Sequence, residues 1–76
     1  MTLSNVKSGQ SCKIIKFNNS KDIIERFRKL GLIEGTKVIV IRKALFNGPI
    51  EILIRSYCLA IRTLDASQIT VELLWK

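Results

Sequence analysis

The spacing of apolar residues changes from a helical period to a strand period near the middle of the chain. Within residues 21–30, apolar side chains recur at the three- and four-residue spacing of an α-helix, at Ile23, Ile24, Phe27 and Leu30. Residues 38–41 are instead a β-branched run, which is typical of a strand. The segment between them holds Gly31 and Gly35, so it predicts a compact corner in which Gly31 ends the helix.

The rest of the chain adds further short strands. Alternation and turn residues predict strands over 12–17, 38–43, 50–55, 59–62 and 69–74, and a single helical turn over 64–68. Ser8-Gly9 predicts a turn in the lead-in to the first strand. Five short strands and one helix in 76 residues favour an all-β domain with one short helix, folded as a small β-barrel that covers residues 1–76.

The central hairpin has one clear core face. Ile50, Ile52 and Ile54 share a face of the return strand, and Phe46-Asn47-Gly48-Pro49 predicts the turn that precedes it. A five-residue loop over 45–49 predicts a register that pairs Val40 with Ile54, Arg42 with Ile52, Ile41 with Leu53 and Ile39 with Arg55.

In that register Ile41 and Leu53 form an outward aliphatic pair flanked by cations, which is a candidate contact patch. The alternative is that the N-terminal segment or the last strand covers the pair.

Charge narrows the classes of partner. The chain has 13 Lys and Arg against 6 Asp and Glu, a net charge of +7. A field of that sign attracts phosphates, both in nucleic acid and on anionic lipid heads, so peripheral association with an anionic membrane surface is compatible with it. The cations are spread along the chain without a run of five, so a generally basic surface explains them as well as a dedicated phosphate site does.

The residues offer little chemistry. There is no histidine, and Cys12 and Cys58 alone are too few for a self-contained structural zinc site, so both thiols are expected to be buried in the core. No nucleophile–base constellation and no phosphate loop is visible. We therefore expect no enzyme, no catalytic residue, no cofactor and no metal ligand. No apolar run is long enough to cross a bilayer, and residues 1–7 do not form a signal peptide.

An ordered set of motifs gives a family resemblance. It runs through Met1-Thr2-Leu3-Ser4, Lys7-Ser8-Gly9-Gln10, Leu30-Gly31-Leu32, Gly35-Thr36-Lys37-Val38, Gly48-Pro49-Ile50-Glu51-Ile52 and Arg55-Ser56-Tyr57-Cys58-Leu59-Ala60-Ile61-Arg62. In this order and spacing the chain resembles the ferrous iron transport protein A (FeoA) family over essentially its whole length. Glu34 stands where that family usually has proline, and Ser56 where it usually has glycine, so a site that needs positive φ would be strained at Ser56.

The resemblance implies a barrel of the Src-homology-3 (SH3) type, a cytoplasmic location and no catalysis. It implies an accessory role in bacterial ferrous iron uptake, through contact with the membrane permease FeoB and its cytoplasmic GTP-binding domain. The candidate contact residues are Ile41, Phe46, Asn47, Gly48, Pro49, Leu53 and Tyr57. For Tyr57 a partly buried core position is an equal alternative, and for Phe46 the alternative is a side chain folded back onto the barrel.

Two other functions remain open at this point. A small basic barrel can bind single-stranded nucleic acid through cations and stacking aromatics, but only 7% of the residues are aromatic, so this function ranks behind the first. The chain also resembles the barrel of iron-dependent repressors, without a DNA-reading helix, which would make it a detached regulatory domain. The sequence leaves open whether copies of the chain associate weakly with one another.

Overall fold

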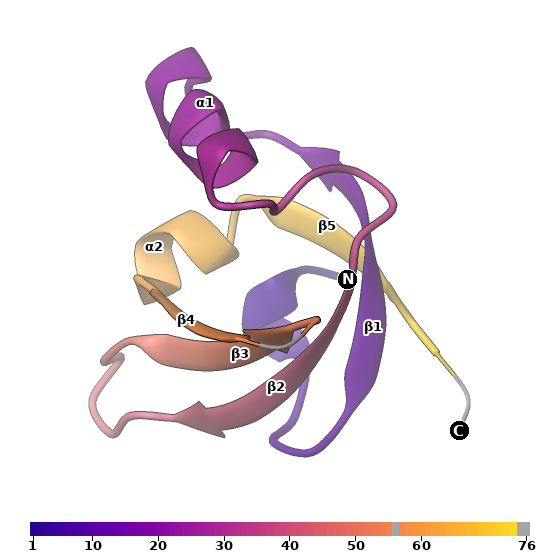
Figure 1. Ribbon diagram of the computed structural model, residues 1–76. Coiled ribbons are helices and arrows are strands. Elements are labelled where there is room, and N and C mark those ends of the chain that lie inside the picture. The colour runs from indigo at the N-terminus through magenta and orange to yellow at the C-terminus, as the bar shows by residue number, and fades with distance from the viewer. Residues whose placement is uncertain (56, 75–76) are drawn as a thin grey trace.

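The computed structural model describes residues 1–55 and 57–74. Its elements in chain order are η1 (Leu3–Asn5), β1 (Ser11–Phe17), α1 (Lys21–Lys29), β2 (Lys37–Lys43), β3 (Ile50–Ile54), β4 (Tyr57–Ile61), α2 (Thr63–Ala66) and β5 (Ile69–Leu73) (Figure 1). The predicted strands, helix and helical turn are therefore confirmed with small shifts at their ends. The 3-10 turn η1 is an addition that the sequence pattern did not predict. Ser56, and with it the expected strain at that site, lies outside the described residues.

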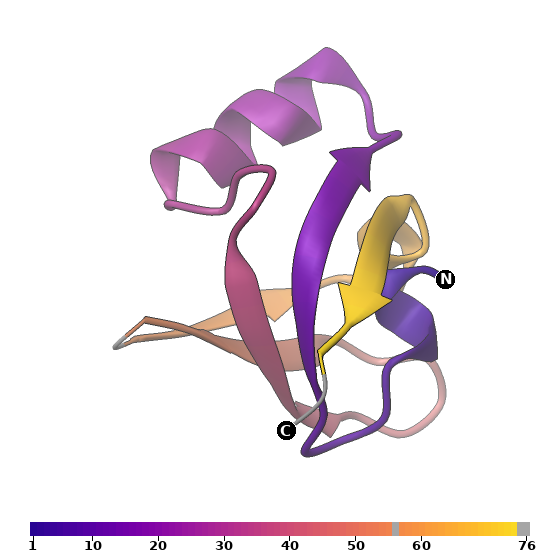
Figure 2. The same ribbon diagram turned by 90° about the vertical axis from the view of Figure 1, so that its right-hand side faces the viewer.

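The strands form one antiparallel sheet in the order β4-β3-β2-β1-β5. The sheet curls strongly, and α1 lies across one end of it (Figures 1 and 2). The helical turn α2 connects the two edge strands β4 and β5, and a bridge between Thr2 and Thr70 fastens the N-terminus beside β5. This arrangement is the five-stranded barrel expected from the sequence.

The core lies inside the curl and consists of one face of every strand. Its buried members from the strands are Cys12, Ile14, Val38, Val40, Ile50, Ile52, Ile54, Ile61, Ile69 and Val71. Leu3, Val6, Phe27, Leu32 and Ala66 close the core from the connecting segments. The predicted inward faces of the hairpin are thus confirmed.

The corner after α1 is a Schellman motif. The amide of Leu32 donates to the carbonyl of Phe27 (2.9 Å), and that of Gly31 donates to Arg28 (3.0 Å). Gly31 has a φ of 91°, which confirms the predicted left-handed end of the helix. Phe27 is the buried residue of α1, and its ring centroid lies 5.8 Å from that of Phe17, whereas Leu30 at the end of the predicted apolar face is 38% exposed. Phe27 is therefore the buried anchor of the helix, and the partly buried Ile23 also packs against the core.

The corner then joins the sheet through a second turn. The amide of Gly35 donates to the carbonyl of Ile14 (2.7 Å), and the amide of Ile14 donates to Thr36 (2.8 Å). The Thr36 hydroxyl accepts from the amide of Ile33 (3.1 Å) and so closes the turn. Residues 30–36 therefore fix where β2 starts beside β1.

The β2–β3 loop is built differently from the prediction. Phe46 and Asn47 have φ values of 57° and 60°, and the amide of Gly48 donates to the carbonyl of Leu45 (3.1 Å), which together describe a type I′ turn. Asn47 takes the positive φ expected of it, but Phe46, and not Gly48, is the other left-handed residue. Gly48 is instead required by space, because a Cβ there would lie 2.5 Å from Cβ of Ala44.

We expect Gly48→Ala to lower the free energy of unfolding by about 1 kcal/mol, because overpacking a close approach forces the loop to shift. For a domain of this size that corresponds to a drop in Tm of about 4–8 °C, measured by thermal unfolding. The double variant Ala44→Gly, Gly48→Ala removes the opposing Cβ and should recover part of the loss. An unchanged Tm in the single variant would contradict this account of Gly48.

Candidate partner-contact surface

The register of the central hairpin differs from the predicted one. The observed pairs are Val38 with Ile54, Ile39 with Leu53, Val40 with Ile52, Arg42 with Glu51 and Lys43 with Ile50. The loop therefore spans six residues, 44–49, and a β-bulge adds another residue at Ile41. Together they displace the pairing by two residues before the bulge, so residues 38–40 keep their predicted faces because the side-chain period of a strand is two. Beyond the bulge the displacement is one residue, so the prediction that Arg42 lies opposite Ile52 on the core face is wrong, and Arg42 lies opposite Glu51.

The observed register changes which residues form the outward aliphatic pair. Ile39, and not Ile41, lies opposite Leu53, while Ile41 occupies the bulge and is half-buried. Ile39 is 39% exposed and Leu53 is half-buried, so neither is fully buried by the part of the chain that the structure describes.

The pair belongs to a longer row on the outside of the sheet. Ser11 pairs with Ile39, Ile39 with Leu53 and Leu53 with Cys58, and the amide of Leu74 donates to the carbonyl of Ser11 (3.0 Å). We call these five residues, Ser11, Ile39, Leu53, Cys58 and Leu74, the outer row. Ile39, Leu53 and Leu74 share the wall of a shallow hollow of about 230 Å³. The outer row is therefore a mainly apolar stripe that crosses the sheet.

Cations border one side of the outer row. Lys13 pairs directly with Lys37, and Arg55, the residue after β3, lines the same hollow as Leu53. Like charges placed opposite each other destabilise a sheet, and the ion pairs among the described residues involve other cations, Arg28, Arg42 and Arg62. Glu72 on β5 pairs with Lys13 from the other side, so this border carries three cations and one acid.

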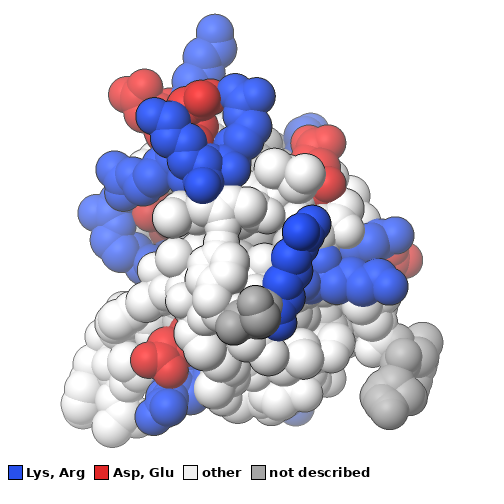
Figure 3. All heavy atoms as spheres, in the orientation of Figure 1, with Lys and Arg blue, Asp and Glu red and all other residues white. Residues whose placement is uncertain are grey.

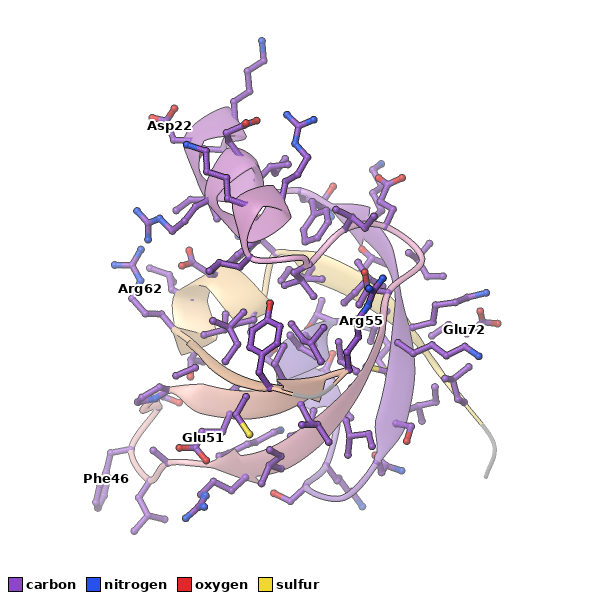
Figure 4. The ribbon with its side chains drawn as sticks, viewed as in Figure 1. Asp22, Phe46, Glu51, Arg55, Arg62 and Glu72 are labelled. Atoms are coloured by element: carbon purple, nitrogen blue, oxygen red, sulfur yellow. The ribbon has the colours of Figure 1, made fainter. Side chains whose placement is uncertain are left out.

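Arg55 connects the outer row to the glycine corner. It has a φ of 54°, and its side chain lies near the turn that leads into β2 (Figure 4). Lys37 and Arg55 line the hollow of the outer row, and they also line a second hollow of about 480 Å³. Gly35 and Glu34 belong to the wall of this second hollow. Glu34, at the position where proline is usual in the family, is exposed on this second surface.

The other border carries a neutralised pair. Arg42 Nε lies 2.9 Å from Glu51 Oε1, and Ala60 follows as the next residue across the sheet. The two borders therefore differ in charge, and the outer row separates them.

Tyr57 lies away from the outer row. It pairs with Ile54 at the end of the barrel and is 40% exposed, and a Cβ on Gly31 would lie 3.3 Å from its hydroxyl oxygen. Its ring therefore reaches across to the end of α1. This position is intermediate between the partner contact and the partly buried core residue that the sequence left open for Tyr57.

The hairpin tip, residues 45–49, is a third surface, separate from the outer row and from Tyr57. Phe46 is 97% exposed and Leu45 80%, so Phe46 does not fold back onto the barrel. Asn47 and Pro49 are exposed beside it, and Gly48 is half-buried. The structure thus divides the candidate contact residues among the outer face, the mouth of the barrel and the hairpin tip. Among the residues that the structure describes, the two exposed aromatic side chains, Phe46 and Tyr57, do not form a joint stacking platform.

The two thiols have different surroundings. Cys12 is buried, and burial raises its pKa from 9.0 to about 11. Its neutral form therefore stabilises the fold below pH 9, and this contribution is lost as pH rises toward 11. Cys58 is exposed in the outer row, so the prediction that both thiols are buried is wrong for it. β4 is an edge strand, and Cys58 and Ala60 on its outer face are exposed.

No group of three or more His, Cys, Asp or Glu side chains that could hold a metal ion occurs within residues 1–55 and 57–74. Over the same residues, no helix is long and apolar enough to span a bilayer.

Comparison with known proteins gives the family. The model of the FeoA domain matches residues 1–73. This chain belongs to the FeoA family. A protein of Campylobacter jejuni assigned as Fe(2+) transport protein A is 30% identical over 74 residues, which cover 97% of this chain and the whole of that protein. The chain is thus similar in sequence to a protein named for ferrous iron transport.

Solved structures of FeoA proteins share the fold. FeoA of Chlorobium tepidum superposes with a TM-score of 0.93 at 32% identity, over 99% of this chain and 71% of that chain. FeoA of Stenotrophomonas maltophilia, described as a prokaryotic SH3 domain protein and solved with zinc, gives 0.78 at 25% identity, over 95% and 89%. These matches confirm the predicted SH3-like barrel.

A likeness to a metal regulator concerns the fold alone. The manganese regulator SloR gives a TM-score of 0.85 at 19% identity, over 97% of this chain and 34% of that chain. The similarity of the barrel to that of metal-dependent repressors is therefore confirmed as a fold, and it carries no functional conclusion.

We expect a disulfide reagent at pH 8 to modify Cys58 rapidly in the folded protein, because its sulfur is exposed. Cys12 should react only when the protein unfolds, since it is buried and stays protonated at that pH. Counting the released thiolate with and without denaturant checks this, with Cys58→Ser as the control that should remove the rapid reaction. Two rapid thiols would contradict the burial of Cys12.

Proposed function

We propose that this chain is a non-catalytic accessory module of ferrous iron uptake that docks its outer row on the cytoplasmic GTP-binding domain of an FeoB-type permease. Membership of the FeoA family supports the transport system, and the partly exposed apolar outer row is the observation that supports docking. In this proposal the module works in the cytoplasm, at the inner face of the membrane.

The chemistry of the outer row suits a protein partner. Ile39 and Leu53 are adjacent aliphatic side chains on rigid strands, so they would lose little conformational entropy when a partner covers them. Fully burying such a side chain contributes about 1.5–3 kcal/mol. Lys13, Lys37 and Arg55 beside the row would accelerate encounter with an acidic surface and fix the orientation of the complex. The partner surface is accordingly an apolar patch with acidic residues on one side.

The candidate residues of the sequence take different places in this proposal. Leu53 stays a contact residue, Ile39 joins it, and Ile41 lies beside the row, in the bulge of β2. Tyr57 is at the barrel mouth, where its hydroxyl faces the end of α1, so a partner that covers the Arg55 corner would reach it. The nucleic-acid function is not favoured, because Phe46 and Tyr57, the exposed aromatics within residues 1–55 and 57–74, do not line one cationic groove.

A pull-down with the permease's cytoplasmic GTP-binding domain, with and without a GTP analogue, tests the docking. We expect Ile39→Glu and Leu53→Glu each to reduce capture about tenfold or more, because each places an unpaired charge in the desolvated centre of the contact. Ile15→Glu is the matched control. Ile15 is 42% exposed on β1, much as Ile39 is on β2, but it lies outside the outer row.

Circular dichroism confirms that each variant is folded before capture is compared. Equal capture of the wild type and both outer-row variants would reject this surface. Failure of the wild type to bind the domain in either nucleotide state would reject the permease as the partner.

A further inference from the structure

The tip of the β2–β3 hairpin presents large apolar side chains that do not contribute to the core. Phe46 and Leu45 are the most exposed large apolar residues among those the structure describes. Phe46 points away from the body of the molecule, at the end of the hairpin (Figure 4). A third apolar side chain, Leu64, is 76% exposed on the neighbouring turn α2, which is tied to the hairpin by a bond from the Thr63 hydroxyl to the Gly48 carbonyl (2.6 Å).

The turn holds Phe46 where it is unfavourable for the barrel alone. A φ of 57° is uncommon for any residue other than glycine, asparagine or aspartate, and for a bulky aromatic it costs free energy. At 97% exposure the ring makes no packing contact that offsets this cost. The side chain therefore has no structural explanation within the described residues, whereas a partner outside the chain would give it one.

We infer that the hairpin tip inserts Leu45 and Phe46 into the interfacial region of an anionic lipid bilayer. The tip is convex, so it fits a medium that opens around an apolar side chain better than it fits a preformed pocket. Interfacial insertion needs apolar side chains to reach only about 5–10 Å into the boundary between headgroups and acyl chains. Two or three large side chains at one projecting end meet that need.

The charges around the tip suit anionic lipid. Residues 42–50 contain Arg42 and Lys43 but no acidic residue, and the whole chain carries +7. Figure 3 shows the tip, at the lower left, as an uncharged lobe, with Lys and Arg gathered mainly over α1. Arg42 is paired with Glu51 and Arg62 with Asp65, yet both arginines are about 70% exposed, so they remain accessible to lipid phosphates. Insertion of the apolar side chains therefore makes membrane binding specific to the tip, and the net positive charge attracts the protein to the anionic surface from a distance.

The geometry leaves the outer row free while the tip is in lipid. Ile39 precedes the loop by five residues of extended strand, a separation on the order of 17 Å. Both surfaces can accordingly be occupied together. Lipid binding by the tip does not depend on the proposed docking, because a vesicle contains no protein.

Co-sedimentation with vesicles tests the insertion directly. The probes are phosphatidylcholine vesicles with about 30% phosphatidylglycerol, compared with pure phosphatidylcholine. We expect the wild type to bind the anionic vesicles, and Leu45→Ser, Phe46→Ser to weaken binding about tenfold or more, because serine cannot supply the apolar transfer term. Ile33→Ser is the matched control. It removes another exposed aliphatic side chain, 48% exposed, from the corner that precedes β2, at the other end of that strand from the tip.

A fluorescent reporter shows whether the side chain itself enters the lipid. Trp75 is the single tryptophan of the chain, so Phe46→Trp in a Trp75→Phe background places the only indole at the tip. We expect its emission to shift to shorter wavelength with anionic vesicles, and brominated acyl chains to quench it.

Each outcome decides the inference. Equal binding of the wild type and the tip variant, or an unshifted indole, would overturn it and leave only a general charge effect that moderate salt removes. Normal vesicle binding by a tip variant that loses capture by the permease domain would instead assign the tip to a protein contact. Loss of capture in outer-row variants that still bind vesicles would leave the insertion standing.

Discussion

The contact between the inner faces of β2 and β3 is the interaction on which the rest of the structure depends. Val38 and Val40 lie against Ile52 and Ile54, and all four are at most 1% exposed. A domain of this size buries only about 60% of the surface that its unfolded chain exposes, so it has few residues to spare for a second layer. One face of each strand is buried in the core, and no helix or strand among the described residues packs over the other face of the central strands.

This shortage explains both the architecture and the free surfaces. The helix α1 covers the end of the barrel through Phe27 and the Schellman corner, so it does not shield the outside of the sheet. The same corner sets the start of β2 through Gly35 and Thr36, and hence decides that Ile39 faces outward beside Leu53. Core packing and the candidate contact surface are therefore two faces of the same strands.

The glycines and left-handed residues show how the fold uses its tight turns. Gly31 satisfies the end of α1, and the space over it is occupied by the hydroxyl of Tyr57. Arg55 and Phe46 accept left-handed conformations without being glycine, and each is exposed at the end of a strand pair. Backbone strain of this kind often accompanies function, and here it occurs beside the two surfaces to which we assign partners.

The sequence predicted the strands and their faces well, because alternation depends only on which side chains must be buried. It failed on the register of the hairpin. The Phe46-Asn47 turn and the bulge at Ile41 depend on loop geometry that no periodicity reports. The outer row was also beyond prediction, because it requires knowing that β1 lies between β2 and β5, which brings Ser11 and Leu74 beside Ile39.

The most direct test of the docking surface is a titration of the ¹⁵N-labelled chain with the permease's cytoplasmic GTP-binding domain, followed by amide chemical shifts. We expect the largest changes in amide chemical shift at Ser11, Ile39, Leu53 and Cys58, with smaller changes at Lys37 and Arg55. Changes confined to α1, or none at saturating partner, would contradict this docking surface.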